Sequence, residues 1–342
     1  MDGNYSLDQQ ERNCNETRTN STNFHIEETA IPFIISIQCV VIIAAICGNS
    51  LVIIAFYKFS SLRTASNVIL VSLCTADSLI VVSFIINISK LSLYLSSSDV
   101  HMLKSVCEVE ALFSFTLIAV IILHLALISV ERFIAIKFFL RYHTIVTYRR
   151  ALFASIAVWL WAVAVILVFP QALRASNNDA YRHLVHAMHP SYKPKKCHSC
   201  GTIPALTKGY LIFLVTTMFV IPLVIILCSY GYIFLVSKKH RKQIKHQGNF
   251  SDISTIKREM KGARTLAIVV AVCLLGIIPL LISTSLRFFG KLPDDDSRRK
   301  LKHFKRIVYA FAFCLNAVCN PVIYGWRDEQ FRDAFRRLLK CV

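Results

Sequence analysis

Long apolar blocks alternate with short charged segments along almost the whole chain. A helix of about 20 apolar residues is long enough to cross the hydrocarbon core of a bilayer. Seven blocks reach that length, and they cover residues 32–57, 66–89, 104–136, 151–171, 206–237, 262–286 and 306–325. We therefore expect an all-α integral membrane protein, in which seven transmembrane helices form one bundle over residues 32–325.

The third block organises this prediction, because polar groups stand near both of its ends. At ~1.5 Å rise per residue, Cys107 and Arg132 lie roughly 37 Å apart along a helix, which is about the hydrocarbon core and part of the headgroups. Ser114 and Arg132 share one stripe, since their separation is about five turns of ~3.6 residues. We interpret this stripe as facing the bundle interior, with a sensing site at one surface and a reporting site at the other.

Apolar residues near the C-terminus recur at a helical spacing, with basic residues between them. This pattern predicts an amphipathic helix on the membrane surface, within a C-terminal segment of residues 326–342. Cys341, near its end, is a candidate for palmitoylation. The apolar positions are Phe331, Ala334, Phe335, Leu338 and Leu339.

The composition supports a membrane setting, with 55% hydrophobic and 17% charged residues, against roughly 25% charged in soluble domains. A transporter or channel would be expected to show inverted repeats or several buried charges, whereas we find one buried acid, Asp77, and no such repeat. A membrane enzyme would need a catalytic cluster, and His124 has no nucleophile or metal set beside it. We expect no enzymatic activity, no cofactor and no nucleic-acid partner.

Charge and sequons together predict the orientation of the bundle. The three segments around 58–63, 137–150 and 238–264 hold fifteen Lys and Arg and only two acids, which is typical of cytoplasmic loops. The polar tail of residues 1–31 lacks an apolar core near Met1, so we expect no cleavable signal peptide. Three clustered sequons in this tail indicate an extracellular, glycosylated N-terminus. They begin at Asn4, Asn15 and Asn20.

Single polar residues and motifs stand inside the blocks in a fixed order. Asp77 should point into the bundle, because an ionisable group at membrane depth is costly unless it faces partners or water. It could clasp neighbouring helices or take part in switching. In order, the motif residues are Asn49, Asp77, Cys107, Glu131-Arg132-Phe133, Trp159 or Trp161, Pro222, Tyr230, Pro279, Asn320-Pro321-Val322-Ile323-Tyr324 and Phe331.

In this order, with each group in its own block, these residues resemble a rhodopsin-like (class A) G-protein-coupled receptor over about residues 32–342. The resemblance implies a plasma-membrane receptor with an extracellular N-terminus and a cytoplasmic C-terminus. It implies heterotrimeric G proteins as partners, together with arrestin, a receptor kinase and membrane lipid. It also implies a two-state switch, in which helix 6 swings outward.

In that switch, Arg132 would pair with Glu131 and with Glu259 in the resting state. On activation Arg132 would be released, and Tyr230 and Tyr324 would turn inward and hold the open form. The residues implied in switching and coupling are Glu131, Arg132, Tyr230, Glu259, Pro279, Asn320, Pro321 and Tyr324.

The chain departs from the family pattern in helices 3 and 6. Ile277 stands where a tryptophan is common, and Cys273 replaces the usual phenylalanine one turn below it, which raises the alternative of a largely ligand-independent, constitutively active receptor. Ile121 stands where many members have a serine that helps to hold sodium. We expect sodium binding at the remaining candidates to be weakened or absent. Those candidates are Asp77, Asn316 and Asn320.

The ligand class stays open between a peptide, a lipid and another small organic molecule. Ser114 occupies the position that is aspartate in amine receptors, and Cys314 occupies the position of the retinal-linking lysine in opsins. Arg287 and Arg306 favour a ligand with an acidic group. The candidate pocket residues are Asn87, Glu110, Ser114, Thr284, Arg287 and Arg306.

The outer segment of residues 172–205 is rich in histidine and cysteine. The resemblance implies a disulfide between Cys107 and either Cys197 or Cys200. One hypothesis for this segment is a zinc site. The alternative is that its histidines are simply solvated, as histidines three apart in a polar loop usually are. The candidate zinc ligands are His183, His186 and His189.

Overall fold

The computed structural model describes residues 24–95, 100–169, 208–244 and 328–340, together with single positions at 267, 268, 270, 271, 275, 321 and 325. These residues form helices and no strand, so the all-α prediction is confirmed for this part of the chain. The elements before the outer segment are α2 (Phe24–Lys58), η1 (Ser60–Leu62), α3 (Ala65–Leu95), α4 (Val100–Lys137), η2 (Phe139–Arg141), α5 (Tyr142–Ile145), α6 (Tyr148–Val163) and η3 (Ala164–Val168). Those after it are α9 (Lys208–Val215), η4 (Thr216–Val220), α10 (Ile221–Ile244) and α13 (Glu329–Leu339).

Five helical stretches are long and apolar enough to cross a membrane, and they coincide with the first five predicted blocks. A lipid environment offers the backbone no hydrogen-bond partners, and a helix satisfies its own backbone groups within a single apolar segment. The sixth and seventh predicted blocks lie outside the described residues, apart from the single positions. The five stretches are Cys39–Lys58, Ala65–Ser83, Leu112–Lys137, Tyr148–Val168 and Ile212–Val236.

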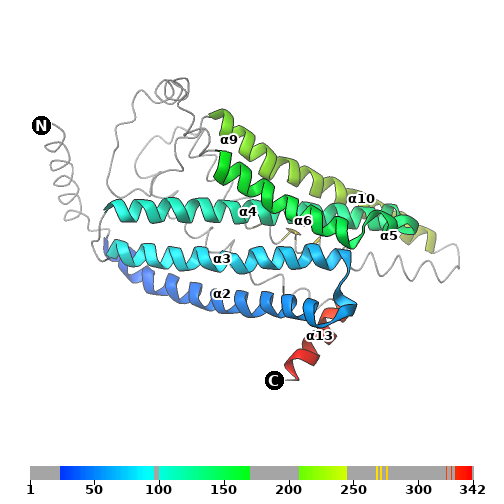
Figure 1. Cartoon of the computed structure of the whole chain (residues 1–342), viewed down its shortest axis with the longest axis horizontal. Coiled ribbons are helices and arrows are strands. Elements are labelled where there is room, and N and C mark those ends of the chain that lie inside the picture. The colour runs from blue at the N-terminus through cyan, green and yellow to red at the C-terminus, as the bar shows by residue number, and fades with distance from the viewer. Residues whose placement is uncertain are drawn as a thin grey trace, which may run out of the picture.

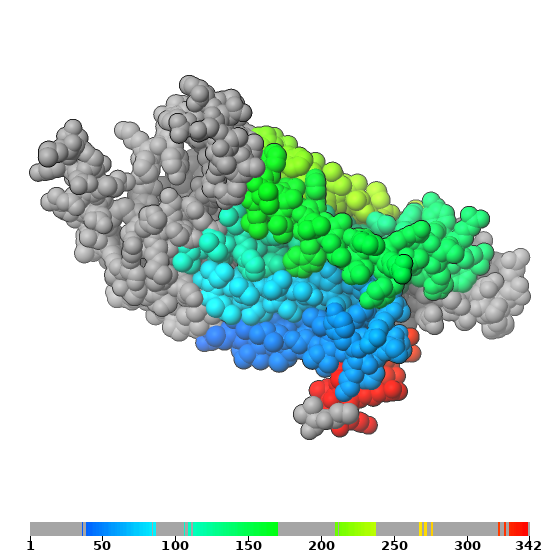
Figure 2. Space-filling model, in the orientation of Figure 1, coloured from blue at the N-terminus to red at the C-terminus, as the bar shows by residue number. Residues whose placement is uncertain are grey.

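The helix α4 lies at the centre of the described bundle. It contacts α3, α6 and α10, while α2 packs on the far side of α3 (Figure 1). Figure 2 shows α6 lying against α3 and α4 on one face of the bundle, with α13 protruding near the end of α2. The centre of the bundle is therefore the place where a polar group on α4 can meet groups from several other helices.

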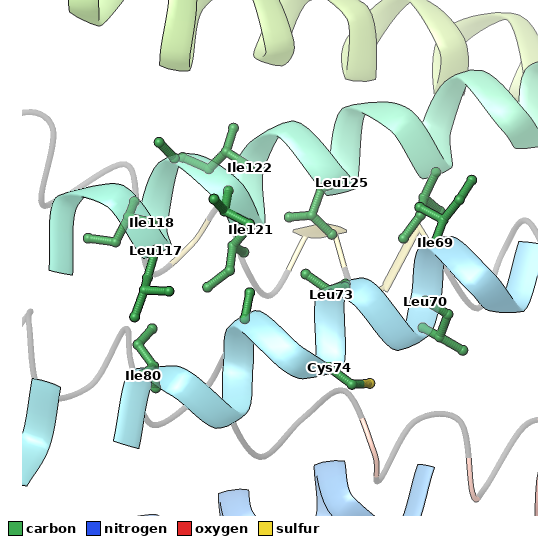
Figure 3. Packing of buried hydrophobic residues seen from close by; sticks show 14 of the residues in the cluster. Ile69, Leu70, Leu73, Cys74, Ile80, Leu117, Ile118, Ile121, Ile122 and Leu125 are labelled. Carbon is green, nitrogen blue, oxygen red and sulfur yellow. The ribbon is translucent and has the colours of Figure 1, made fainter. Parts of the chain in front are cut away.

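Interdigitated apolar side chains fill the interface between α3 and α4 (Figure 3). Leu73 and Ile80 of α3 and Ile121 and Leu125 of α4 are almost fully buried there. Because lipid tails are as apolar as these side chains, close packing rather than the exclusion of water holds such helices together.

The predicted amphipathic C-terminal helix is present as α13. The Asp328 side chain caps its first turn, because Oδ1 accepts hydrogen bonds from the backbone N–H groups of Gln330 at 2.9 Å and Phe331 at 3.2 Å. Phe331 and Ala334 are buried, and α13 packs against α2 and η1, whereas Leu339 is 66% exposed. Phe335 and Leu338 also pack partly on the core, so most of the apolar face rests on the bundle and Leu339 is left for the membrane surface.

Candidate functional site

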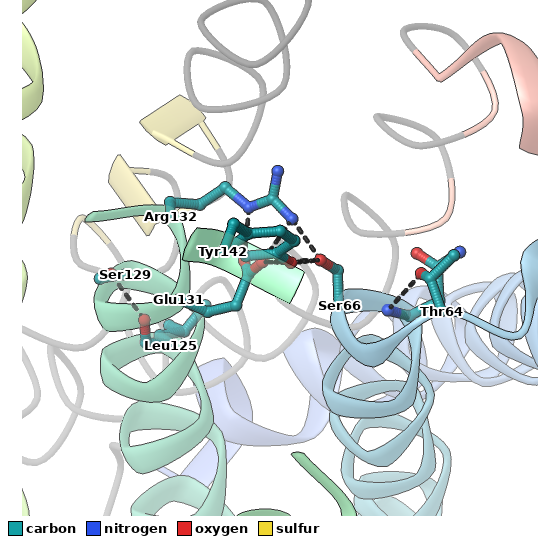
Figure 4. A network of polar contacts seen from close by, with 8 residues as sticks. Thr64, Ser66, Leu125, Ser129, Glu131, Arg132 and Tyr142 are labelled. Carbon is teal, nitrogen blue, oxygen red and sulfur yellow. Dashed lines mark hydrogen bonds and ion pairs between the residues drawn. The ribbon is translucent and has the colours of Figure 1, made fainter. Parts of the chain in front are cut away.

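The candidate site lies at the end of α4, where α3 begins and α5 follows. Glu131 and Arg132 belong to the last two turns of α4, Ser66 to the first turn of α3, and Tyr142 is the first residue of α5. Figure 4 shows these four side chains pointing toward one another. The Glu131 side chain is 3% exposed and that of Arg132 is 13% exposed. A charge pair is therefore held almost entirely out of solvent.

The Glu131 carboxylate accepts hydrogen bonds from three residues. Arg132 Nε donates to Oε2 at 2.5 Å, and Arg132 Nη2 donates to Oε1 at 2.9 Å. Ser66 Oγ donates to Oε1 at 2.7 Å, and the Tyr142 hydroxyl also donates to Oε1. Arg132 Nη2 donates to Ser66 Oγ as well. A buried charge is costly unless it is paired and hydrogen-bonded, so this arrangement makes the closed pair stable.

Two local features position the partners of Glu131. The Thr64 side chain accepts a hydrogen bond from the Asn67 backbone N–H at 3.3 Å and so caps the start of α3, next to Ser66. The Arg150 guanidinium of α6 donates to the carbonyls of Thr144 and Ile145 at 2.9 Å each. Because Arg150 bonds the last carbonyls of α5, it fixes the short helix that begins with Tyr142.

Tyr142 stays protonated at neutral pH and keeps donating its hydrogen bond. Burial raises the pKa of its hydroxyl well above the usual value, and the negative charge of Glu131 and the hydrogen bond to it act in the same direction. Sequence reasoning missed both Tyr142 and Ser66. A tyrosine in a short loop and a serine at a helix start carry no signal of their own, and only the packing brings them to Glu131.

Tyr230 and Lys137 link α10 to the same end of α4. The Tyr230 hydroxyl is buried close to the Ser129 side chain of α4 and within electrostatic reach of Arg132 and Glu131. The Lys137 ammonium lies 5.1 Å from the ring centre of Phe133 on α4 and 5.8 Å from that of Tyr232 on α10. Cation–π contacts of this kind favour the approach of the two helix ends.

A second buried polar network joins α3, α4 and α6 farther inside the bundle. His124 Nδ1 lies 2.8 Å from the Val120 carbonyl, which can only accept, so Nδ1 carries the hydrogen in the neutral ring. Nε2 then accepts from Ser72 Oγ at 2.8 Å, and Ser72 Oγ accepts from Trp159 Nε1 at 3.0 Å. His124 is thus fully engaged as a structural link between helices.

Asp77 and Asn49 are completely buried in the bundle interior, as predicted for Asp77. The Asn49 amide donates to the Ala45 carbonyl at 3.0 Å.

Pro321 is buried, and its Cγ lies 2.5 Å from where a Cβ would stand on Gly48, so this position admits only glycine without a shift. The described residues contain no cluster of three potential metal ligands.

Two of the candidate pocket residues have described side chains. Glu110 and Ser114 lie one turn apart on α4 and are both buried, at the end of the bundle opposite to Arg132. The backbones of Asn87 and Cys107 belong to α3 and α4. The remaining predicted site residues lie outside the described residues. They are Asn4, Asn15, Asn20, His183, His186, His189, Cys197, Cys200, Glu259, Pro279, Thr284, Arg287, Arg306, Asn316, Asn320, Tyr324 and Cys341.

Comparison with known proteins gives one family and a consistent set of relatives. The sequence model described as "7 transmembrane receptor (rhodopsin family)" matches residues 48–324. Adenosine receptor A2b of Gallus gallus is 28% identical over 316 residues, which cover 90% of this chain and 88% of the relative. Adenosine receptor A2b of Rattus norvegicus is 29% identical over 325 residues, 91% of each chain. Adenosine receptor A2a of Homo sapiens is 28% identical over 311 residues, 90% of this chain and 72% of the relative.

Proposed function

The chain belongs to the rhodopsin family of seven-transmembrane receptors, and from that premise we propose that an extracellular ligand opens the bundle at Arg132 to activate a heterotrimeric G protein. It is a multi-pass membrane receptor rather than an enzyme, with G proteins as the partner class of its family. We place it in the plasma membrane, with residues 1–31 outside and residues 326–342 inside. Arrestin and a receptor kinase complete the proposed set of partners.

The observation that carries this proposal is the buried Glu131–Arg132 pair with its donors Ser66 and Tyr142. The four side chains come from α3, α4 and α5, so any movement that separates these elements breaks several charge-assisted hydrogen bonds at once. An arrangement that is either complete or broken suits a two-state switch. A ligand biases such a switch only by binding one state more tightly than the other.

In the proposed resting state, Glu259 of the sixth helix is the second partner of Arg132. Activation moves that helix outward around Pro279 and frees the guanidinium. Tyr230 supports this step, because its hydroxyl is buried within electrostatic reach of the charge pair and can turn toward Arg132. Tyr324, with Asn320 and Pro321 before it, would complete the open form from the seventh helix.

The ligand enters, in this proposal, at the opposite end of the bundle, where Glu110 and Ser114 are buried on α4. The relatives are named adenosine receptors, which makes adenosine the first compound to test. Arg287 and Arg306 also favour ligands with an acidic group, and both peptides and lipids can carry such a group. The family match removes the transporter or channel alternative.

The proposal is tested in cells that express the full chain, with a panel of G-protein dissociation sensors. Adenosine and a library of peptides and metabolites are applied, and Arg132→Ala is compared with Arg149→Ala, which replaces an exposed arginine outside the charge pair. We expect dissociation of at least one G protein, lost in Arg132→Ala and kept in Arg149→Ala. Equal signalling by both variants at equal surface expression would refute the proposed switch.

The sequence of the sixth helix favours a second candidate, a receptor with high ligand-free activity. Ile277 and Cys273 replace two aromatic residues that are common in the family. Basal second-messenger levels of the native chain and of Ile277→Trp distinguish the candidates, because restoring the tryptophan should lower a constitutive signal. Equal levels would count against this candidate.

A further inference from the structure

Tyr210 forms a direct link between the fifth and fourth transmembrane helices. Its side chain, 6% exposed, reaches from α9 to η3, and its hydroxyl donates a hydrogen bond to the Val165 backbone carbonyl. Its ring also stacks on Phe169, with 5.6 Å between ring centres and 22° between ring planes. Both ends of this contact lie at the end of the bundle opposite to Arg132 (Figure 1).

The local backbone explains why the Val165 carbonyl is open to a partner from another helix. The segment η3 is a π-helical turn, in which the Phe169 N–H bonds to the Ala164 carbonyl five residues back. In that register the next donor, for Val165, would be the N–H of residue 170. Residue 170 is a proline and has no N–H. A carbonyl left without a donor inside a membrane is strongly unfavourable.

The fifth helix also contains a π turn followed by a proline. In η4 the Ile221 N–H bonds to the Thr216 carbonyl five residues back, and Pro222 follows directly. A π turn that ends one residue before a proline therefore occurs in both helices. Among the described contacts, only the fourth-helix turn receives its missing donor from a side chain of the neighbouring helix.

We propose that Tyr210 is a positioning residue that supplies the hydrogen-bond donor Pro170 lacks, and thereby fixes the end of the fourth helix against the fifth. These ends flank residues 170–207, which are extracellular in the proposed orientation, so the link sets one wall of the ligand-binding end. The importance of this link for ligand binding rests on the proposed function. The link itself can be tested without ligand or G protein.

The test is a double-mutant cycle on the melting temperature of the purified full-length receptor in lipid nanodiscs. Tyr210→Phe removes only the hydroxyl and keeps the stacked ring, so we expect a fall of roughly 2–6 °C, since a buried carbonyl loses its donor. Pro170→Ala restores a backbone N–H at residue 170. In that background Tyr210→Phe should lower the melting temperature by less than half as much.

Two matched controls separate this link from general packing. Pro222→Ala restores an N–H in the fifth helix, so its effect should add to that of Tyr210→Phe without rescue. Tyr57→Phe changes an exposed tyrosine and should leave the melting temperature unchanged. Pro170→Gly, which also carries an N–H, replaces Pro170→Ala if that variant does not fold.

Rescue by an N–H at residue 170 alone supports the proposal, because a tyrosine that merely packs would not respond to the backbone at that position. An unchanged melting temperature in Tyr210→Phe, or an equal loss in every proline background, would overturn it. Neither outcome bears on G-protein activation, so the proposed function stands or falls separately in the signalling experiment.

Discussion

The behaviour of Glu131 depends on which single atoms surround it. Arg132 follows it directly in sequence, and neighbouring residues on a helix normally point in different directions. Here the long arginine side chain folds back, because Ser66 Oγ accepts from its guanidinium while also donating to the carboxylate. Tyr142 adds a further donor from α5. Two adjacent hydroxyls, 3.1 Å apart, therefore donate to the same carboxylate oxygen and hold the pair closed.

Tyr142→Phe should raise ligand-free activity. The substitution removes one hydrogen bond to the charged carboxylate, worth about 1.5 kcal/mol, which shifts a two-state equilibrium roughly tenfold toward the open form. Basal nucleotide exchange on G proteins in membranes from expressing cells measures this change. Tyr148→Phe, at an exposed tyrosine six residues on, is the control. Identical basal exchange in the two variants would show that Tyr142 does not restrain the switch.

Between helices, a few buried polar contacts and close approaches decide the geometry. Packing alone tolerates small rotations of apolar helices, whereas a hydrogen bond in a low-dielectric interior holds only at its proper distance. Ser72 joins three helices in this way through His124 and Trp159. Gly48 acts through a close approach instead, since it has no side chain and so leaves room for Pro321 against α2.

Ser72→Ala should destabilise the protein by about 1–3 kcal/mol, because it leaves both His124 Nε2 and Trp159 Nε1 without a partner in the interior. Thermal unfolding of the purified receptor measures the loss. Ser155→Ala is the control, since Ser155 is more deeply buried than Ser72 but its hydroxyl has no partner in the described part of the chain. We expect that variant to be neutral or slightly stabilising. Equal losses would mean that burial, and not the network, matters.

Gly48→Ala should lower the melting temperature, because the new Cβ would stand 2.5 Å from Pro321 Cγ and overpacking of this kind costs about 1–3 kcal/mol. Gly231→Ala is the comparison, since nothing lies within 4 Å of a Cβ at that position. There the gain in helix propensity, up to about 1 kcal/mol, should keep or raise the melting temperature. A neutral Gly48→Ala would show that the two helices separate easily.

For the whole molecule, charge distribution and bundle architecture make the two ends different. The described cytoplasm-assigned turns carry Lys58, Arg63, Arg141 and Arg149, all exposed. The buried charge pair lies at this same end, and the Tyr210 link lies at the other. A bundle with these two ends suits a protein that receives a signal on one side and passes it on at the other.

Antibody tags at the two termini test the proposed orientation. A tag before residue 4 should be stained in intact cells, because residues 1–31 are assigned to the outside, whereas a tag after residue 342 should require permeabilisation. Asn4→Gln, Asn15→Gln and Asn20→Gln together should shift the electrophoretic mobility if the sequons are glycosylated. Staining of both tags in intact cells would place the termini on one side and contradict seven crossings.

The sequence by itself determined the helices, their order and their membrane setting. A continuous apolar block of spanning length satisfies its backbone hydrogen bonds in lipid by forming a helix, so the first five crossings were predictable, and the apolar spacing predicted the amphipathic α13. The buried positions of Asp77 and Ser114 followed from the cost of exposing polar groups to lipid and from helical periodicity. These features depend on local composition and spacing.

Only the tertiary structure decided which polar groups meet. Ser66 and Glu131, Ser72 and Trp159, and Val165 and Tyr210 stand 65, 87 and 45 positions apart. Whether such residues touch depends on how each helix is rotated and how far it slides along its neighbour. Apolar periodicity fixes neither to within the length of a hydrogen bond. The switch and the Tyr210 link are therefore properties of the packed bundle, because their atoms become neighbours only when the helices associate.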